Sequence, residues 1–244
     1  MMEIDFFVPV YNPGEILEPN LRKIYGILEK NTKKFTLFVV DDHSTDDTPT
    51  TLGKINDLPH LKPVFFPTGP SRRENLATAI EKYLEKPFCG FCDIDLAVSA
   101  AQIPTALQKL SEYDIVIGNR YHQSKIIPRN KTRMIVSWLY RNLLQTYHGS
   151  NITDHQCGFK FFKASPLHTL LTMMDTFDHA TQVKYNFPYR GWFWDAELLL
   201  LAQYYCYQIH ELPVEWRQKE SLAGFRQELK AIPYILRWHP QKRR

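Results

Sequence analysis

The sequence predicts an α/β fold in which helices flank a mostly parallel central sheet. Two observations lead to this prediction: short apolar runs alternate with amphipathic stretches of helical spacing, and several apolar runs end in acidic or polar turns. The composition is that of a globular chain, because 44% of the 244 residues are hydrophobic and 23% are charged. Disordered, collagen-like and coiled-coil proteins are therefore excluded.

In the first half of the chain, each predicted strand is a short apolar run and each predicted helix is a longer stretch with one apolar face. The second predicted helix begins at Ser44, Thr45 and Asp46, which are suitable N-caps. In chain order, strands are expected at Ile4–Val10, Leu37–Val40, Val64–Phe66, Phe88–Cys92 and Ile115–Ile117, and helices at Glu15–Lys30, Asp46–Asn56, Arg72–Glu85 and Ala101–Ser111.

The second half of the chain is basic where the first is acidic. Residues 115–153 contain no Asp or Glu, although they contain several Lys and Arg residues. We expect a small antiparallel addition to the sheet and one domain over residues 1–220, followed by a basic tail over residues 221–244 with a C-terminal amphipathic helix. The expected elements are helices at Met134–Tyr147 and Asp195–Tyr205 and strands at Phe159–Phe162 and Ile209–Trp216.

Charge and hydropathy exclude several classes of protein. A net charge of +4 is too small to indicate nucleic-acid binding. We find no apolar span of about 18 residues that could cross a bilayer, and acids stand where a signal peptide carries Lys or Arg. We therefore expect a cytoplasmic protein. Cys89 and Cys92 should point to opposite faces of their strand, which indicates packing residues and not a shared metal or disulfide.

Two carboxylates one residue apart follow the fourth predicted strand. Asp93 and Asp95 come directly after Phe88–Cys92, and ligands of open parallel sheets bind beyond the carboxyl ends of the strands. Hard divalent cations prefer carboxylate and phosphate oxygens. We predict that Asp93 and Asp95 bind a diphosphate through such a cation, which would offset the leaving group's negative charge. The alternative is a pair of solvated acids.

Two other strand ends carry candidate binding residues. The second predicted strand runs into Asp41 and Asp42, where an acid can accept hydrogen bonds from a base or a ribose. The first strand runs into Tyr11, whose ring could cover a base. For the turn after the second strand, the alternative is that its acids, Asp46 and Asp47, begin the following helix. For the first strand, the alternative is an ordinary core strand with a turn.

Together, these strand ends resemble in order and spacing those of the inverting family 2 glycosyltransferases of the GT-A fold. The segments Gly118–Tyr121, Asp154–Lys160, Trp194–Leu199 and Glu211–Trp216 are similar to the dolichyl-phosphate glucosyltransferase and mannosyltransferase branch. The Asp-His-Gln-Cys-Gly-Phe-Lys form of the second segment is most similar to the glucosyl members. The resemblance covers about residues 3–220, which would be the catalytic domain.

The resemblance implies a function and a donor site. The chain would transfer a hexose, with glucose from UDP-glucose expected, to dolichyl or undecaprenyl phosphate in the synthesis of cell-envelope glycans. Mg2+ or Mn2+ would be the cofactor, bound by Asp93 and Asp95. The nucleoside pocket would be lined by Pro9, Tyr11, Asp41 and Asp42.

The resemblance also implies an acceptor site. Its residues would be Arg120, Lys160 and Arg133 facing the acceptor phosphate, Asp154 and Gln156 under the sugar, and Asp195 and Glu197 organising the site. Two departures from the family pattern have consequences. The stretch Gly69–Asn75 lacks the usual small Gly-rich turn, so that Arg72 or Arg73 would contact the diphosphate instead. Ala97 stands where the mannosyl members place a Gln ligand, which disfavours mannose.

A phosphate acceptor determines the mechanism. A phosphate monoester has a second pKa of about 6 and needs no base at neutral pH. Two phosphate groups about 6 Å apart repel by about 3 kcal/mol per pair of unit charges at an effective dielectric near 20. Basic side chains and a cation are needed to offset this repulsion. We expect direct in-line attack on the anomeric carbon, inversion, and departure of the nucleoside diphosphate.

Other functions and partners stay open. Transfer to a glycan or protein hydroxyl would use Asp195 or Glu197 as the base, and a third alternative is a nucleotide-sugar binding module without turnover. The basic amphipathic stretches either pack on the sheet or attach the protein to the cytoplasmic face of a membrane, with Trp138 and Tyr140 or Trp238 near the interface. A membrane-protein partner is a further alternative.

Overall fold

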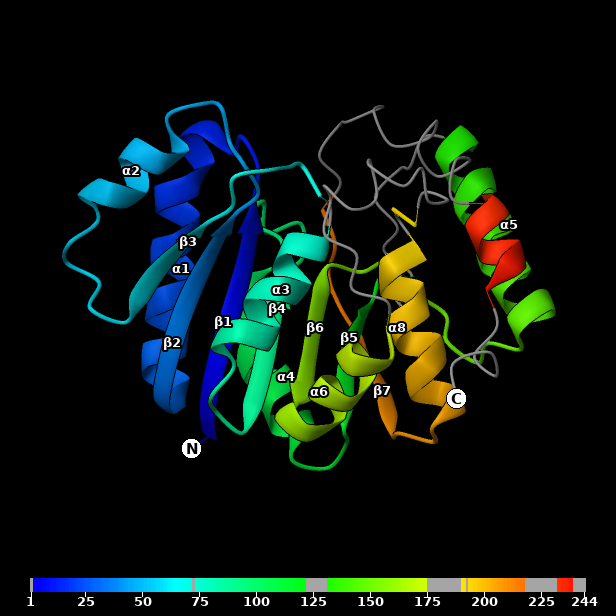
Figure 1. Ribbon diagram of the computed structural model, residues 1–244. Helices are drawn as coiled ribbons and strands as arrows, with labels where there is room; N and C mark the ends of the chain where they lie inside the picture. The colour runs from blue at the N-terminus through cyan, green and yellow to red at the C-terminus, as the bar shows by residue number, and fades with distance from the viewer. Residues whose placement is uncertain are drawn as a thin grey trace.

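A seven-stranded mixed sheet forms the centre of the computed structural model (Figure 1). The structure describes residues 2–71, 73–121, 131–174, 190–191, 193–217 and 232–238, and of residues 131–136 it describes the backbone alone. The strand order is β3-β2-β1-β4-β6-β5-β7. All neighbouring strands are parallel except for the two pairs that β6 makes with β4 and β5. The predicted parallel sheet with a small antiparallel addition is confirmed.

The strands and helices follow the predicted order with shifted ends. The strands are β1 (Met2–Val10), β2 (Thr32–Asp41), β3 (Leu61–Phe65), β4 (Phe88–Cys92), β5 (Ile115–Asn119), β6 (Phe159–Lys163) and β7 (Ile209–Pro213). The helices are η1 (Gly14–Ile16), α1 (Leu17–Asn31), α2 (Thr48–Lys54), α3 (Glu74–Tyr83), η2 (Ala100–Gln102), α4 (Ile103–Leu110), α5 (Lys131–His148), α6 (Ala164–Met173) and α8 (Phe193–Tyr204), and residues 232–237 form one more helix.

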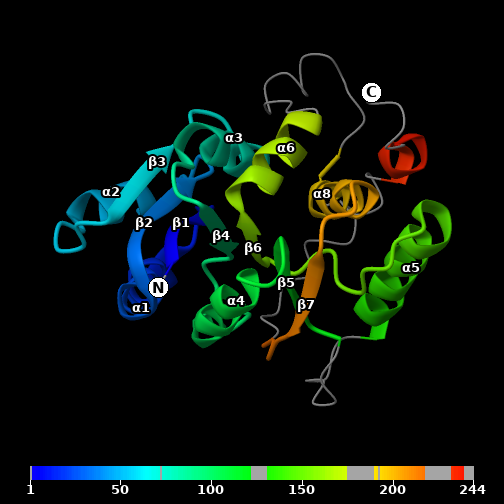
Figure 2. The same ribbon diagram turned by 90° about the horizontal axis from the view of Figure 1, so that it is seen from below.

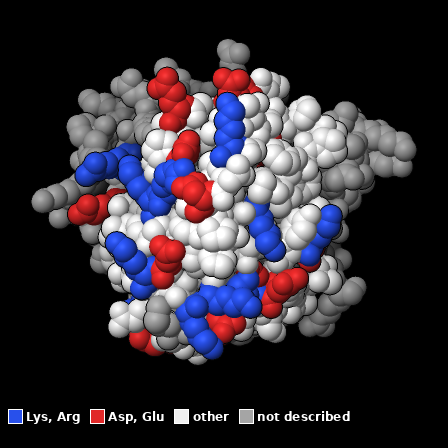
Figure 3. Space-filling view, turned by 90° about the vertical axis from the view of Figure 1, so that its left-hand side faces the viewer, with Lys and Arg blue, Asp and Glu red and all other residues white. Residues whose placement is uncertain are grey.

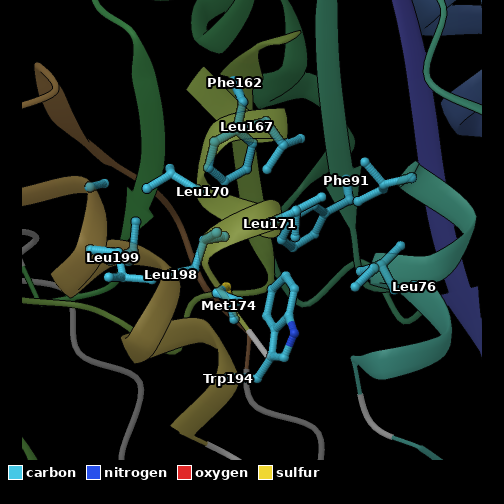
Figure 4. Close-up of a cluster of buried hydrophobic side chains, with 14 of the residues drawn as sticks. Leu76, Phe91, Phe162, Leu167, Leu170, Leu171, Met174, Trp194, Leu198 and Leu199 are labelled. Carbon is cyan, nitrogen blue, oxygen red and sulfur yellow. The ribbon is translucent and has the colours of Figure 1, made fainter. Parts of the chain in front are cut away.

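Helices cover both faces of the sheet because its strands are apolar on both sides. The helices α1, α2 and α4 pack on one face, and α3, α6 and α8 pack on the other (Figure 2). The second face holds the larger aromatic and leucine-rich core, in which Phe91 of β4 and Trp194 of α8 lie among leucines of α6 (Figure 4). Cys89 belongs to this core and Cys92 to the opposite one, as the alternation of the strand predicts.

The helix at residues 232–237 packs against α5 at the outer side of α8 (Figure 1). Ile235 and Trp238 are buried in the core that α8 shares, and the Tyr147 hydroxyl donates to the Leu236 carbonyl at 2.9 Å. The expectation that Trp238 lies at a membrane interface is wrong, because its side chain is only 5% exposed and packs against His148 and Phe193. The division of the chain at residue 220 stays a prediction.

Two predicted element ends are wrong for local reasons. The N-cap of α2 is Asp47, which makes no side-chain cap hydrogen bond, while the Asp46 carboxylate accepts from the Thr48 N–H at 3.1 Å. β7 ends at Pro213 and not at Trp216, which makes an isolated bridge with Val98.

Two surface features bear on partners. In the described part of the chain, no helix has the length and hydrophobicity that crossing a bilayer requires. Figure 3 shows acidic and basic side chains interspersed on the side of the molecule where α1, α2 and β3 lie, so the described residues of this face form no single-signed field.

Candidate active site

The candidate residues meet where the parallel strands end, at the top of Figure 1. Register brings the ends of β1 and β2 side by side, with Val10 opposite Asp41, and the Asp42 N–H donates to the Val10 carbonyl at 2.9 Å. β4 pairs with the other side of β1, so that Asp93 follows on the neighbouring strand. Because these strands run in the same direction, the acidic turns that follow them lie close together at one edge of the sheet, although they are far apart in the sequence.

Beyond the ends of β1 and β2, a short turn after β2 is held by Asn12. The Asn12 side-chain oxygen accepts from the Thr45 N–H at 2.7 Å, and the Asn12 N–H donates to the Ser44 hydroxyl at 2.9 Å. Asp41 is buried and accepts from the Ser44 N–H at 3.0 Å. Tyr11 is 45% exposed beside this turn. Asn12 was not singled out from the sequence, although it follows Tyr11 in the first strand's polar turn.

Asp42 holds the loop that precedes α3. Its carboxylate is buried and accepts from the Ser71 N–H and the Ser71 hydroxyl, both at 2.8 Å, and from the Asn75 amide at 2.6 Å. A Cβ at Gly69 would lie 2.2 Å from the Asp42 carbonyl oxygen, so this close approach requires glycine. The stretch that departs from the family pattern is thus a loop built on Asp42. Arg72 lies outside the described residues.

Arg73 connects two of the predicted carboxylates. Its Nη2 lies 3.0 Å from Asp93 Oδ1, and its Nε donates to Asp195 Oδ2 at 3.3 Å. The guanidinium also lies over the Phe91 ring, 5.4 Å from its centroid, and the side chain is only 14% exposed. Arg73 was predicted to contact a diphosphate, and the structure pairs it with Asp93 and Asp195.

Asp195 lies between two cations. The completely buried Lys160 donates to Asp195 Oδ1 and to the Cys157 carbonyl, both at 2.6 Å. Burial alone would raise the pKa of Asp195, but the charges and hydrogen bonds of Lys160 and Arg73 lower it. Asp93, Arg73, Asp195 and Lys160 therefore form a chain of alternating charges from the end of β4 to the first turn of α8.

The position of Asp93 depends on Gly158. The Asp93 N–H donates to the Gly158 carbonyl at 3.1 Å, and a Cβ at Gly158 would lie 1.8 Å from Asp93 Oδ2. The glycine of the 154–160 segment is therefore needed for this close approach, a function that its place in the motif did not reveal. Asp93 and the 154–160 segment are therefore parts of one packed unit.

The corner made by Asp93 and Asp95 fits a hard divalent cation by the chemistry of its donors. The Asp93 side chain is 48% exposed, and the Asp95 carboxylate accepts from the Ala97 N–H at 3.0 Å in the turn after β4. In the described part of the chain, no group of three or more His, Cys, Asp or Glu side chains could hold a metal. Two carboxylates would leave the remaining ligand positions to a diphosphate and water.

After β5, Arg120 forms a bidentate pair with Asp154. Arg120 Nε and Nη2 donate to the two carboxylate oxygens at 2.7 Å each, and the Arg120 N–H donates as well, at 2.9 Å. Burial would raise the pKa of Asp154, but the Arg120 charge and its hydrogen bonds lower it. Glu211 of β7 fixes this segment from below, because it accepts from the N–H groups of Thr153 and Asp154, both at 3.0 Å.

Two other predicted residues lie differently in the site. Gln156 Nε2 is buried and has no hydrogen-bond partner among the described residues, so it keeps a donor for a ligand. Arg133 lies in the first part of α5, residues 131–136, where only the backbone is described.

Glu197 belongs to a separate buried cluster. Its Oε2 accepts from Arg190 Nη1 at 3.3 Å and from the Tyr234 hydroxyl at 3.0 Å, and Arg190 also donates to Glu74 at 2.6 Å. Glu197 has no exposed surface. Through Arg190 and Tyr234, it ties α8 to α3 and to the helix at 232–237. Arg190 and Glu74 were not identified from the sequence, because no local pattern relates positions so far apart.

His155 is a buried neutral residue of the 154–160 segment. Its Nε2 lies 2.7 Å from the Ser150 hydroxyl. Burial lowers the pKa of His155 to about 4. It therefore carries no charge at neutral pH and shapes the turn before Cys157.

Known proteins resemble this chain in sequence. The model of the family described as Glycosyl transferase family 2 matches residues 5–171. The chain is 26% identical over 223 residues to Glycosyltransferase AglD of Haloferax volcanii, covering 89% of this chain and 34% of that protein. It is 23% identical over 239 residues to the Dolichyl-phosphate beta-glucosyltransferase of Saccharomyces cerevisiae, covering 88% of this chain and 66% of that protein. The chain thus spans about a third of the archaeal relative and two thirds of the yeast one.

Solved structures share the fold. Glucosyl-3-phosphoglycerate synthase from Mycobacterium tuberculosis, in complex with Mn2+, UDP and glucosyl-3-phosphoglycerate, superposes with a TM-score of 0.64 at 16% identity, over 96% of this chain and 79% of that one. The TarS fragment of S. aureus in complex with UDP-GlcNAc gives a TM-score of 0.54 at 18% identity, over 90% and 59% of the two chains. These likenesses confirm the GT-A fold.

Proposed function

Because this chain belongs to glycosyl transferase family 2, we propose that it is an inverting hexosyltransferase that moves glucose from UDP-glucose to a polyprenyl phosphate. The curated relatives named Dolichyl-phosphate beta-glucosyltransferase, from yeast and from Homo sapiens, support the acceptor and the sugar. The motif at residues 154–160 supports the glucosyl branch, and Ala97 at the position of the mannosyl ligand disfavours mannose.

The hydrogen bonds and the pKa of Asp195 favour a phosphate acceptor over a hydroxyl acceptor. A hydroxyl acceptor needs a base with a pKa near the working pH. Asp195 is unsuited to this task, because both its oxygens are engaged by Lys160 and Arg73 and its pKa is lowered. Glu197 is enclosed with Arg190 and Tyr234. A phosphate dianion needs no base, and we infer that phosphate is the nucleophile.

The donor would bind at the corner between β1, β2 and β4. We assign Tyr11 to the face of the base and Asp41 to the nucleoside, with Pro9 and Asp42 supporting this pocket from the ends of β1 and β2. Asp93 and Asp95 would hold Mg2+ or Mn2+ with the diphosphate. When bound, the cation offsets the negative charge that develops on the leaving diphosphate.

The acceptor phosphate would approach from the side of Arg120. A guanidinium has five N–H donors, and Asp154 takes two from the side chain, which leaves donors for a phosphate. Gln156 Nε2 would donate to the sugar. Lys160 is enclosed, so we assign it the role of fixing Asp195. Arg72 and Arg133 stay candidates for phosphate contact.

The reaction then needs no proton transfer. One oxygen of the acceptor phosphate forms a bond to the anomeric carbon, while the bond from that carbon to the diphosphate oxygen breaks. The bonding electron pair leaves with UDP, and the configuration inverts. The chain's residues contribute by holding donor and acceptor in line. Such positioning lowers the reaction barrier, because the reactants are already oriented when the bond forms.

The exposed side of α5 would rest on the membrane that contains the acceptor. Trp138 and Leu139 are each 54% exposed, Tyr147 is 46% exposed, and Leu236 on the adjoining helix is 43% exposed. Apolar side chains beside basic ones are typical of helices at the lipid interface. Flotation with anionic vesicles tests this: the double variant Trp138→Ser and Leu236→Ser should lose binding. Phe65→Ser, a change at a residue 51% exposed on the far edge strand β3, should keep it.

Radiolabelled UDP-glucose, Mn2+ and a pair of matched lipids test the function. We expect label to enter polyprenyl phosphate and not the corresponding polyprenol, which lacks the phosphate. Equal labelling of the polyprenol or of a glycan hydroxyl would refute the phosphate acceptor. UDP binding without UDP release on either kind of acceptor would indicate a binding module.

A further inference from the structure

Arg73 forms an ion pair with Asp93, one of the two carboxylates that would bind the donor's cation. We propose that Arg73 is an internal counter-ion of the donor site, which leaves Asp93 when a divalent cation and a nucleoside diphosphate bind together. Its Nη2 lies 3.0 Å from Asp93 Oδ1, and Asp93 is one of two carboxylates at this corner. The inference rests on the proposed function, because it requires that Asp93 belongs to a donor site.

Charge makes the two occupants of Asp93 compete. A guanidinium and a divalent cation on the same carboxylate repel one another, and the repulsion is strong where solvent is scarce. The Arg73 side chain is only 14% exposed, so water screens it poorly. A cation without nucleotide therefore has to displace Arg73 from Asp93 and leave it with Asp195 alone as an anionic partner. A diphosphate gives the guanidinium a new anionic partner. The planar guanidinium of arginine binds phosphate oxygens well, through two parallel hydrogen bonds.

The loop fixes the backbone of Arg73 and leaves its tip to move. Ser71 and Asn75 are anchored on Asp42. The Arg73 carbonyl accepts from the Ala77 N–H at 2.8 Å in the first turn of α3. Arg73 Nε keeps a second partner in Asp195 at 3.3 Å. A rotation about this contact would carry Nη2 away from Asp93 with no change in the loop.

This arrangement couples cation and nucleotide. Each should raise the affinity of the other by the same factor, since coupling between two binding events is reciprocal. A free cation would then bind weakly, and the site would assemble only when the donor arrives. Asp93 is not left as a bare anion before that, because Arg73 neutralises it.

Binding of Mn2+, measured by the electron paramagnetic resonance signal of the free ion, tests the inference without using activity. We expect UDP to tighten Mn2+ binding to the unmodified protein by about 30-fold, within the usual range of coupling. Arg73→Gln should bind Mn2+ alone about 10-fold more tightly and show a UDP effect of about 3-fold or less. Arg73→Lys keeps the charge but not the fork, and should give intermediate values.

The control and the outcomes separate this inference from the function beneath it. Arg22→Gln removes a guanidinium of α1 that pairs with Glu18 on the same helix and with Asp57 after α2, and should change neither value. Asp195 keeps Lys160 in the Arg73 variants, so the chain of charges is not left bare. If the Arg73 variants matched the unmodified protein in both values, the inference would be overturned and the donor site would stand. If the unmodified protein bound no Mn2+ even with UDP, both would fall.

Discussion

Replacing Gly158 by alanine should disable the donor site while leaving the fold intact. The added Cβ would lie 1.8 Å from Asp93 Oδ2 and 2.4 Å from Asp93 Cγ, whereas ordinary contact begins at 3.4 Å. The carboxylate must therefore move by about 1.5 Å, and a misplacement of about 1 Å in a catalytic group can cost about 100-fold. Because the Asp93 side chain is 48% exposed, it can turn into water, and we expect a stability loss of only about 1 kcal/mol.

Calorimetric titration with UDP in the presence of Mn2+ and the transfer assay measure this effect. We expect Gly158→Ala to lose about 100-fold in kcat/KM and most of its cation-dependent UDP affinity. Gly26→Ala is the matched control, since a Cβ at Gly26 within α1 meets no atom within 4 Å. Unchanged UDP affinity in a folded Gly158→Ala protein would refute the reasoning, because Asp93 would then be displaced from its place without consequence for the donor.

Three other predictions concern stability and can be checked by urea denaturation. Gly26→Ala should stabilise the protein by about 0.5–1 kcal/mol, the usual gain when a free helical glycine becomes alanine, and a loss would contradict the open space at this site. Asp195→Asn should lower the free energy of unfolding by about 3–5 kcal/mol, because it leaves the buried Lys160 ammonium without its carboxylate. Adding Lys160→Met should recover much of that loss. A cost below about 1 kcal/mol for the single change would show that the pair is dispensable. His155 has a pKa of about 4 in the folded protein against 6.5 for an unperturbed histidine, so only the unfolded chain takes up this proton between these pH values. Stability should therefore fall as the pH drops from 6.5 to 4, by about 3 kcal/mol from this group, and His155→Gln should remove that part of the pH dependence; an identical pH profile in the variant would be evidence against a buried neutral His155.

The sequence predicted the sheet because its signals are local. Apolar runs such as Phe88–Cys92 and the acids that follow them report strand ends directly, and parallel register then brings Asp41, Asp42 and Asp93 to one edge. The same local reasoning placed Cys89 and Cys92 on opposite faces. The roles given to the individual site residues stay predictions, because only ligands can test them.

The ion pairs of the site could not be predicted, because they join distant segments. Arg73 and Asp195 are 122 residues apart, and Glu74 and Arg190 are 116 apart. A sequence pattern of helical or strand period carries no information on such pairs. Trp238 was misplaced for a related reason, since an amphipathic stretch with aromatic residues predicts an exposed helix equally well whether or not another helix covers it.

The alternating charges connect the two sides of the site to which we assign donor and acceptor. Asp93 and Lys160 are joined through Arg73 and Asp195, so a change of partner at one end alters the charge felt at the other. Gly158 strengthens this link by placing the 154–160 segment against Asp93. We expect donor and acceptor binding to be coupled for this reason.

Diffraction at the manganese absorption edge, from crystals grown with Mn2+ and UDP, tests the central claim most directly. The account predicts an anomalous peak at the carboxylates of Asp93 and Asp95, in contact with the diphosphate, with the Arg73 guanidinium turned from Asp93 toward the phosphates. UDP bound elsewhere, or bound here with no manganese peak at these two carboxylates, would contradict it.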